Sequence, residues 1–416
     1  MTSEALAQNG DQQENKTELL SLGPDFNGDG YGDMVIGASG ERFGDAIRTG
    51  AVTILFGDSN QLFSDSVILH QGLPNIIGEN TPNDRFGSRT TYGDFNGDGL
   101  DDLIITAPQK DVNGIEEAGM VWVLPGISQG MGIINIAFAF DLSMFIDNNN
   151  ISMGDQWGAM VSAGDFNGDG FEDLAISSPN ANICNEEDAI LTVYLYGASN
   201  GSCNKENAGL IVILYGSTDG LETDSYQIIN QTTPGIPDAS ETDDMWGATM
   251  TSGDFNGDEI SDLAVGAPGE KYGFFQSAGA VTVIYGSDVG LNPETSKRFH
   301  QDTLRVPGRN EENDQWGSTL TSGDFSQNGI DDLIIGSPNE SIGQKLQSGS
   351  ITVLYGSPNG VSAQKSRRIH QGSFGVDDRN EPYDRWGSVL TTGDFNGDSR
   401  TDLVIGAPAE GTETLI

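Results

Sequence analysis

The sequence predicts an all-β fold, a β-propeller in which repeated four-stranded blades are arranged in a ring. The stretch Asp25–Asp33 (DFNGDGYGD) recurs five more times, at steps of 69, 71, 89, 70 and 70 residues, beginning at Asp94, Asp165, Asp254, Asp324 and Asp394. A repeating internal period of this length indicates a repeat architecture. Each full repeat also holds four short apolar, β-branched runs bounded by Gly, Pro and Asn, which is the strand content of one propeller blade. We number the copies one to six in chain order.

The motifs around each copy predict the order of elements within a blade. An aromatic–glycine pair lies eight residues before the first Asp of copies two to six, at Phe86, Trp157, Trp246, Trp316 and Trp386. An Asp lies ten residues before the same position, and a Pro fourteen residues after it. The expected order is strand, Asp-rich loop, strand, long connection, strand, Gly-rich turn, strand. In an antiparallel sheet, successive connections lie at alternate ends of the strands. The Asp-rich loops and the Gly-rich turns should therefore share one face of the propeller. The long, variable connections, where binding is expected, should share the other face.

The repeats divide the chain into a disordered segment, 1–16, and one propeller domain, 17–416. The repeat boundaries fall near 17–83, 84–154, 155–243, 244–313, 314–383 and 384–416, and the last copy is incomplete. We expect six or seven blades in the intact protein.

Composition limits the classes of function. The chain has 416 residues, 57 of them Gly, with 19 basic and 62 acidic side chains and a formal net charge of −43. The lack of a basic stripe excludes a nucleic-acid partner. Residues 1–20 lack the apolar core of a signal peptide, and no stretch reaches transmembrane length, so membrane insertion of this chain is not expected. The acidic surface and the Asp-rich loops still favour an extracellular or cell-surface location, where the five Asn-x-Ser/Thr sequons could be glycosylated.

The Asp-rich loops are predicted calcium sites. Oxygen-bearing side chains stand at positions 1, 3, 5 and 9, and position 7 offers a backbone carbonyl, which is the oxygen-rich donor set that calcium prefers. Three acidic side chains within nine residues also repel one another unless a cation lies between them. The predicted ligands are Asp25, Asn27, Asp29, Tyr31 and Asp33; Asp94, Asn96, Asp98, Leu100 and Asp102; Asp165, Asn167, Asp169, Phe171 and Asp173; Asp254, Asn256, Asp258, Ile260 and Asp262; Asp324, Ser326, Asn328, Ile330 and Asp332; and Asp394, Asn396, Asp398, Arg400 and Asp402.

The six loops are not expected to bind equally. Glu259 and Ser399 replace the turn glycine of copies four and six, at a cost of roughly 1 kcal/mol each. Copy five has lost two ligands to Ser326 and Asn328, so we expect it to be weak or empty, and we expect calcium in the other five loops, with somewhat weaker binding in copies four and six. An EF-hand is excluded because position 12 is apolar in every copy. Metal-free Asn-Gly and Asp-Gly hairpin turns remain the alternative.

Together these motifs resemble a known family. The combination of Phe/Trp-Gly, Gly-Asp-Phe-Asn-Gly-Asp-Gly and Gly-Ala-Pro is similar to the FG-GAP repeat of the integrin α-chain propeller. The form with about 70 residues per repeat most resembles bacterial secreted integrin-α-like proteins. The resemblance covers about residues 17–410 and implies a calcium-binding propeller, but such propellers serve adhesive, accessory and structural roles.

Three features that could suggest an enzyme are better explained by the repeat. His70, His300 and His370 each lie 24 residues before the next loop, so they are spread around the ring. The G-x-S-x-G pattern at 197–201 coincides with the Gly-rich turn of the other copies, and no helix pattern follows it. The repeated tryptophans are expected to pack between blades rather than to bind carbohydrate.

The step of 89 residues arises from a tandem duplication of 19 residues, 184–202 and 203–221. Cys184 and Cys203 are therefore duplicates of one position. They either form a disulfide that closes off the first copy, leaving the second as the blade strand, or remain two free thiols.

We therefore expect a non-enzymatic, calcium-binding adhesion or protein-interaction module. Its unidentified protein or glycan ligand should bind the face opposite the calcium loops. The alternatives are an accessory propeller of a secreted hydrolase of the phospholipase D type and a glycan-binding, lectin-like module.

Overall fold

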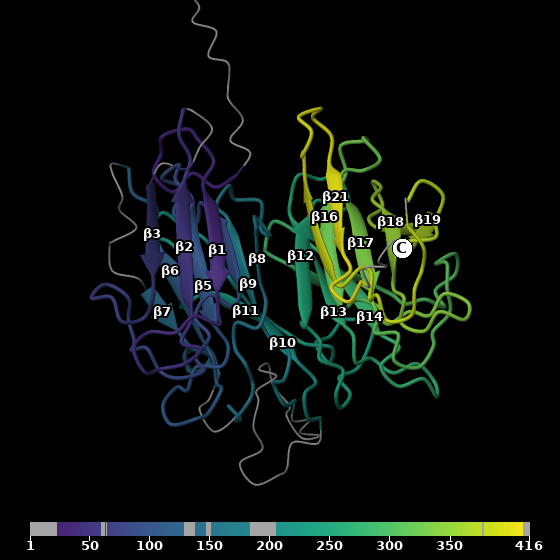
Figure 1. Cartoon of the computed structure of the whole chain (residues 1–416), viewed down its shortest axis with the longest axis horizontal. Helices are drawn as coiled ribbons and strands as arrows, with labels where there is room; N and C mark the ends of the chain where they lie inside the picture. The colour runs from purple at the N-terminus through teal and green to yellow at the C-terminus, as the bar shows by residue number, and fades with distance from the viewer. Residues whose placement is uncertain are drawn as a thin grey trace, which may run out of the picture.

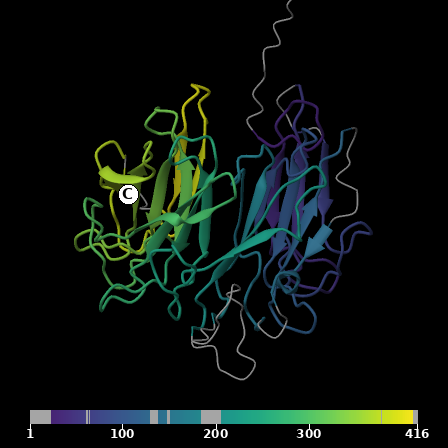
Figure 2. The same cartoon turned by 180° about the vertical axis from the view of Figure 1, so that it is seen from behind.

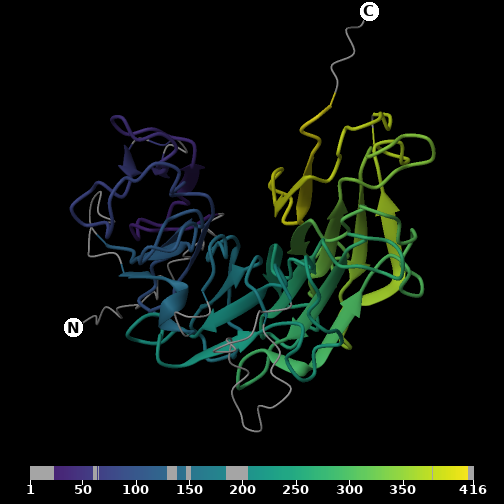
Figure 3. The same ribbon diagram turned by 90° about the horizontal axis from the view of Figure 1, so that it is seen from below.

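The computed structural model describes residues 23–59, 63, 65–128, 138–146, 151–183, 205–376 and 378–410. These residues form six antiparallel sheets (Figure 1). Figure 3 shows the sheets following one another around an arc, with the first and the last sheet at its two ends. The predicted all-β propeller of repeated blades is thereby confirmed. The segment predicted to be disordered, 1–16, lies outside the described residues.

Each sheet corresponds to one sequence repeat. The first sheet contains β1 (Met34–Ala38), β2 (Ala51–Phe56) and β3 (Asp65–Leu69). The second contains β4 (Thr90–Gly93), β5 (Asp102–Ala107), β6 (Met120–Leu124) and β7 (Phe138–Phe140), after which the 3-10 helix η1 (Leu142–Met144) leads to the third. The third contains β8 (Val161–Gly164), β9 (Asp173–Ser178), β10 (Leu210–Leu214) and β11 (Tyr226–Ile229).

The remaining sheets repeat the pattern. The fourth contains β12 (Thr249–Gly253), β13 (Asp262–Ala267), β14 (Ala280–Tyr285) and β15 (Asn292–Phe299). The fifth contains β16 (Thr319–Gly323), β17 (Asp332–Ser337), β18 (Ser350–Tyr355) and β19 (Ser362–Ile369). The sixth contains β20 (Val389–Gly393) and β21 (Asp402–Gly406).

In sheets two to six the strand register places the Asp-rich loop at the tip of a hairpin, and the loop of copy one directly precedes β1. In the second sheet Gly93 pairs with Asp102, so the loop between them closes the β4–β5 hairpin. The same pairing joins Gly253 to Asp262 in the fourth sheet. In copies two to six, position 9 is therefore also the first residue of the strand that follows the loop, and Asp33 of copy one directly precedes β1. The sequence encodes this arrangement because Gly and Asn at the loop favour turns, whereas the apolar run that follows favours a buried strand.

The hydrophobic core lies between neighbouring sheets rather than within one sheet. One cluster, for example, joins Val281 and Val283 of β14 to Leu333 and Ile335 of β17. Trp316 belongs to the same cluster and is fully buried. Phe86, Trp157, Trp246 and Trp386 are also buried. The prediction that the repeated aromatic residues pack between blades is confirmed.

The two ends of the strands carry different connections. In Figure 1 the β20–β21 hairpin, in yellow, carries its Asp-rich loop at the upper end of the strands. Figure 2 shows the same arrangement from behind, with the yellow β20–β21 hairpin again reaching the upper end. The long connections after the central strands therefore lie at the end opposite the Asp-rich loops. None of the described helical residues forms a segment with the length and hydropathy of a membrane span.

The duplicated segment enters the third sheet through its second copy. Strand β10, within the second copy, pairs directly with β9, with Leu210 opposite Ser178. The first copy, together with Cys184, Cys203 and the G-x-S-x-G pattern at 197–201, lies outside the described residues.

The position of Trp246 gives the first testable prediction. Trp246 is fully buried in the cluster between the third and fourth sheets. Replacing it by Ala leaves a cavity that one blade cannot fill alone, so Trp246→Ala should reduce the free energy of unfolding by about 3–5 kcal/mol. Urea denaturation measures this loss, and Phe374→Ala is the control because Phe374 is fully exposed. Equal stability of the two variants would contradict a core located between blades.

Candidate metal sites in the Asp-rich loops

The Asp at position 9 connects three parts of each blade. In copy one, Oδ2 of Asp33 accepts the backbone N–H of Phe26 at 2.9 Å, and Oδ1 accepts that of Gly57 in the Gly-rich turn at 2.9 Å. Position 9 of copies two to five accepts the equivalent Gly N–H at 2.8–2.9 Å, from Gly126, Gly216, Gly286 and Gly356. The Gly-rich turn therefore lies against the Asp-rich loop, as the sequence predicts.

The Asp at position 1 organises the turn of the loop. The carboxylate of Asp25 accepts backbone N–H groups from Gly28 at 2.8 Å, Asp29 at 3.2 Å and Gly30 at 2.8 Å. The side chain of Asn27 accepts the N–H of Asp29 at 2.9 Å, in the manner of an Asx turn. The same contacts recur in copies three, four and six. The loop conformation is thus encoded by its own Asp and Asn side chains.

Side chains within a loop also contact one another. In copy one Nδ2 of Asn27 lies 3.1 Å from Oδ2 of Asp29, and in copy two Nδ2 of Asn96 lies 3.3 Å from Oδ2 of Asp102. The amide thus places a partial positive charge beside a loop carboxylate. In no loop of the described residues do all three carboxylates offer oxygens within 4.8 Å of one another. The donor set still fits a hard divalent cation, since amide and backbone oxygens complete its coordination.

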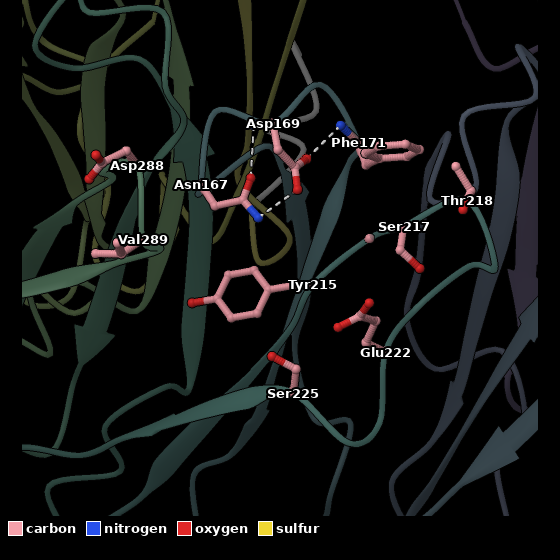
Figure 4. Close-up of a pocket in the computed structure, with 11 residues that line it drawn as sticks. Asn167, Asp169, Phe171, Tyr215, Ser217, Thr218, Glu222, Ser225, Asp288 and Val289 are labelled. Atoms are coloured by element: carbon pink, nitrogen blue, oxygen red, sulfur yellow. Dashed lines mark hydrogen bonds between the residues drawn. The ribbon is translucent and has the colours of Figure 1, made fainter.

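Figure 4 shows the loop of copy three at the edge of an open pocket of about 430 Å³. Asn167 and Asp169 line one side of this pocket, with their mutual hydrogen bonds dashed. Tyr215 and Glu222 of the same blade line another part, and Asp288 comes from the next blade. Solvent and ions therefore reach this loop from the face of the propeller.

Neighbouring loops are joined to one another around this face. The carbonyl of the position 1 Asp accepts the N–H at position 8 of the next loop, at distances of 3.3, 3.2, 2.8 and 2.9 Å for the donors Asp101, Glu172, Ser261 and Asp331. A side chain at position 7 also packs onto the preceding loop. A Cβ added to Gly97 would lie 2.5 Å from Phe171, and one added to Gly257 would lie 2.9 Å from Ile330. An ion held in one loop would therefore restrain its neighbours as well.

Sequence reasoning did not foresee this contact between loops. Oδ2 of Asp101 accepts the N–H of Asp25 at 2.8 Å, and Oδ2 of Asp331 accepts that of Asp254 at 3.1 Å. Only the recurrence of an acid at position 8 in copies two, three and five signalled it.

The structure bears out the strain expected in copies four and six. Glu259 has φ of 69° and Ser399 has φ of 63°, in the left-handed region that disfavours side chains with a Cβ. Gly30, Gly99 and Gly170 stand at the same position in copies one to three, also with positive φ.

Copy five keeps the loop conformation with fewer ligands. Asp324 accepts the N–H of Asn328 at 3.0 Å and that of Gly329 at 2.8 Å, and Asp332 accepts that of Ser326 at 2.9 Å. This loop therefore folds like the others although two carboxylate or amide ligands are missing. Its weak binding of calcium stays a prediction.

Burial raises the pKa of the position 9 carboxyls in copies one to five. The pKa is raised to about 6 for Asp33, about 7 for Asp102 and Asp173, and about 8 for Asp262, with desolvation as the largest cause and the loop's other Asp residues adding repulsion. A carboxylate in such a position is unfavourable unless a cation compensates its charge. A cation bound at these loops would supply that compensation.

The histidines form a repeated local contact. Nδ1 of His70, His300 and His370 lies 3.2, 3.2 and 3.1 Å from the Nδ2 of Asn80, Asn310 and Asn380, respectively. The three residues therefore lie in separate blades with the same partner, which agrees with a structural role.

A second group of acidic residues lies at the opposite end of the blades. Two groups of three acidic side chains have oxygens within 4.8 Å of one another: Glu241, Asp244 and Glu270; and Glu381, Asp384 and Glu410. The sequence signals them through an Asp ten residues before each loop and a Glu sixteen residues after it. Only the first of these two positions was recognised from the sequence.

The fold and the six Asp-rich loops define a repeat propeller with candidate divalent-cation sites. The FG-GAP repeat family matches residues 18–55, 86–124, 157–214, 246–284, 316–354 and 386–414. The chain therefore belongs to the FG-GAP repeat family.

Known proteins similar to the chain include an enzyme and an integrin. It is 37% identical to the phosphatidylinositol-glycan-specific phospholipase D of Mus musculus over 166 residues, 39% of this chain and 18% of that protein. It is 28% identical to integrin alpha-PS2 of Drosophila melanogaster over 191 residues, 44% of this chain and 12% of that protein. The matched regions are thus small parts of both relatives.

Among solved structures, the Bacillus licheniformis rhamnogalacturonan lyase PL11 aligns with a TM-score of 0.39 and 13% identity, over 90% of this chain and 68% of that one. This similarity is too low to support a functional argument.

The raised pKa values predict how stability depends on pH. A carboxyl whose pKa is higher in the folded state than in the unfolded state stabilises the fold at low pH, and this contribution is lost as the pH rises through the folded value. In EGTA the melting temperature should therefore fall between about pH 4 and pH 8, the interval set by Asp33, Asp102, Asp173 and Asp262. Saturating calcium should abolish most of this fall, because the cation stabilises the ionised carboxylates. Scanning calorimetry at a series of pH values measures both effects. Identical profiles with calcium and with EGTA would contradict cation binding at position 9.

The strained residue in copy four gives a further prediction. Glu259→Gly should raise the free energy of unfolding by about 1 kcal/mol, because Gly adopts a positive φ without a steric penalty. The reverse change at the same loop position, Gly170→Glu in copy three, should lower it by a similar amount. Chemical denaturation of both variants in saturating calcium provides the measurement. A stabilising Gly170→Glu change would show that the backbone strain is not the determining factor.

Proposed function

We propose that the chain is a calcium-stabilised, extracellular interaction module without catalysis of its own. Calcium, when bound, would supply charge compensation for the Asp-rich loops. In the protein itself, the position 9 Asp fixes each Asp-rich loop to the Gly-rich turn of its blade. The contacts between neighbouring loops would then make adjacent blades rigid relative to one another. The ligand would bind at the other face.

The observation that supports this choice of face is the distribution of exposed apolar side chains. Phe274, Leu304 and Phe374 have exposed fractions of 97%, 82% and 109%, and all three lie in long connections opposite the Asp-rich loops. Leu346 and Tyr383, in connections of the same face, are 55% and 54% exposed. Apolar side chains held out into solvent on a rigid scaffold are typical of a protein-binding surface.

Similarity to an integrin supports an adhesive role, whereas similarity to a phospholipase D supports an accessory role beside an enzyme. The described residues favour the non-catalytic option for this chain, since the three histidines and the buried tryptophans all have repeated structural contacts. A propeller that positions a separate hydrolase domain is the second candidate, supported by the 37% identity to the mouse phospholipase D. A glycan-binding disc is the third.

Binding to a panel of purified cell-surface and extracellular matrix proteins tests the proposal. Surface plasmon resonance in calcium should reveal at least one partner, and the triple variant Phe274→Ala, Leu304→Ala, Phe374→Ala should weaken that binding at least tenfold. The control is Val289→Ala, an equally exposed apolar residue (82%) in the turn beside the Asp-rich loops.

The other outcomes distinguish the alternatives. Binding lost in the Val289 variant but kept in the triple variant would place the ligand on the calcium-loop face and overturn the proposal. Binding to a glycan array without any protein partner would support the lectin-like alternative, and phosphatidylinositol-glycan cleavage by the isolated chain would contradict a non-catalytic role.

A further inference from the structure

A group of three carboxylates lies at the end of the fourth blade that is opposite the Asp-rich loops, two of them buried and the third, Glu241, exposed. Glu241, Asp244 and Glu270 offer carboxylate oxygens that all lie within 4.8 Å of one another. Asp244 and Glu270 are only 1% and 3% exposed. Glu241 belongs to the connection that precedes β12, and Glu270 follows β13, so the group joins two connections of one blade.

Two buried oxygens at this group have no hydrogen-bond partner among the described residues. They are Oδ1 of Asp244 and Oε1 of Gln231, whose residues are each 1% exposed. Through their other polar atoms, both residues form hydrogen bonds with members of the group. Nε2 of Gln231 donates to Oε2 of Glu270 at 2.9 Å, and Oδ2 of Asp244 accepts the N–H of Glu241 at 2.5 Å. A buried acceptor without a donor is costly, so each of these oxygens requires a positively charged or donating partner.

Protein cations compensate only part of the charge. Arg298 pairs with Asp238 at 2.8 Å and with Glu270 at 2.9 Å. Among the described residues, no ion pair is formed by Glu241 or Asp244, so Arg298 compensates only two of the four carboxylates. Burial raises the pKa of Asp244 to about 7, and burial together with the nearby Asp244 raises the pKa of Glu270.

The second blade contains the same site with a cation built into the chain. Lys110 stands sixteen residues after its loop Asp, where the fourth blade has Glu270. Its Nζ lies 2.8 Å from Oδ2 of Asp84, the counterpart of Asp244, and the pair is buried. Nε2 of Gln71, the counterpart of Gln231, donates to the same oxygen at 3.1 Å. The position thus accepts a positive charge inside the protein.

The sixth blade repeats the ligands of the fourth. Glu381, Asp384 and Glu410 are grouped within 4.8 Å, and Oε1 of the neighbouring Gln371 is buried without a partner among the described residues. The fifth blade has the same four residue types at Gln301, Glu311, Asp314 and Glu340, but its carboxylates are not grouped this closely, and Arg368 lies 3.0 Å from Glu340. The arrangement is therefore a recurrent feature of the blade rather than an isolated acidic patch.

We infer that Gln231, Glu241, Asp244 and Glu270 form a second type of divalent-cation site, opposite the Asp-rich loops, with an equivalent site in the sixth blade. All four ligands supply oxygen, which selects a hard cation such as calcium or magnesium over zinc. A cation there would fix the connection before β12 to the connection after β13, beneath the exposed residues of the proposed binding face.

Counting bound calcium per chain tests this inference. After equilibrium dialysis of the full chain against saturating calcium, elemental analysis should show one ion fewer in Glu270→Lys than in the unmodified protein. The substitution copies the residue found in the second blade, so the fold should be retained. Glu116→Lys is the matched control for the change in charge, because Glu116 is an exposed residue of a long connection on the same face. It should leave the count unchanged.

Two further variants test whether the lost ion comes from this group of carboxylates. Asp244→Asn keeps the acceptor for the N–H of Glu241 and should also lose one ion, which guards against misfolding of the lysine variant. Asp258→Asn removes a ligand of the Asp-rich loop in the same blade, and its loss should add to that of Glu270→Lys.

The outcome that overturns the inference is equally definite. If Glu270→Lys and Asp244→Asn bind as many calcium ions as the unmodified protein while Asp258→Asn binds fewer, the calcium belongs to the loops alone. The buried carboxyls then share protons instead of a metal. If no variant and no unmodified protein binds calcium, both types of site fail together.

Discussion

The position 9 Asp is the constraint on which the structure of each blade depends. In copies two to six it is the first residue of a strand. It accepts an N–H from the start of its loop in copies one and three to six, and in copies one to five it accepts another from the Gly-rich turn. One carboxylate therefore ties together segments that are 24 residues apart. Placing it at a buried strand end costs desolvation, which explains why its pKa rises.

The rest of the face follows from that constraint. Because the loop must remain close to its own Gly-rich turn, it also meets the loop of the preceding blade, and each contact requires a small residue. Gly97 and Gly257 leave room for Phe171 and Ile330 of the next loop. The face that carries the Asp-rich loops is thus a continuous band of connected loops rather than a set of independent turns.

The connections on the opposite face are held in place differently. Its connections vary in sequence and carry exposed apolar side chains, yet their ends are held by buried polar groups. In the second blade Lys110 supplies the compensating charge, in the fourth Arg298 supplies part of it, and among the described residues Oδ1 of Asp244 has no hydrogen-bond partner. If the inferred second site binds a cation, equivalent positions of this scaffold hold either a side-chain cation or a bound one. The buried polar groups hold the two ends of each long connection, whereas the residues in the middle of the connection differ from blade to blade.

The sequence by itself determined the repeat, the four-strand order of a blade and the residues of the Asp-rich loops. These features are local, since the spacing of Asp, Asn and Gly fixes a turn and the apolar runs fix the strands beside it. The strain at Glu259 and Ser399 could be predicted for the same reason, because the preference for a positive φ belongs to a single position. Only the tertiary structure decided which distant groups meet. The contact of Asp101 with Asp25, and the grouping of Gln231 with Asp244 and Glu270, join residues whose separation along the chain carries no local signal. Such contacts arise because packing neighbouring blades around one axis brings the ends of separate hairpins together.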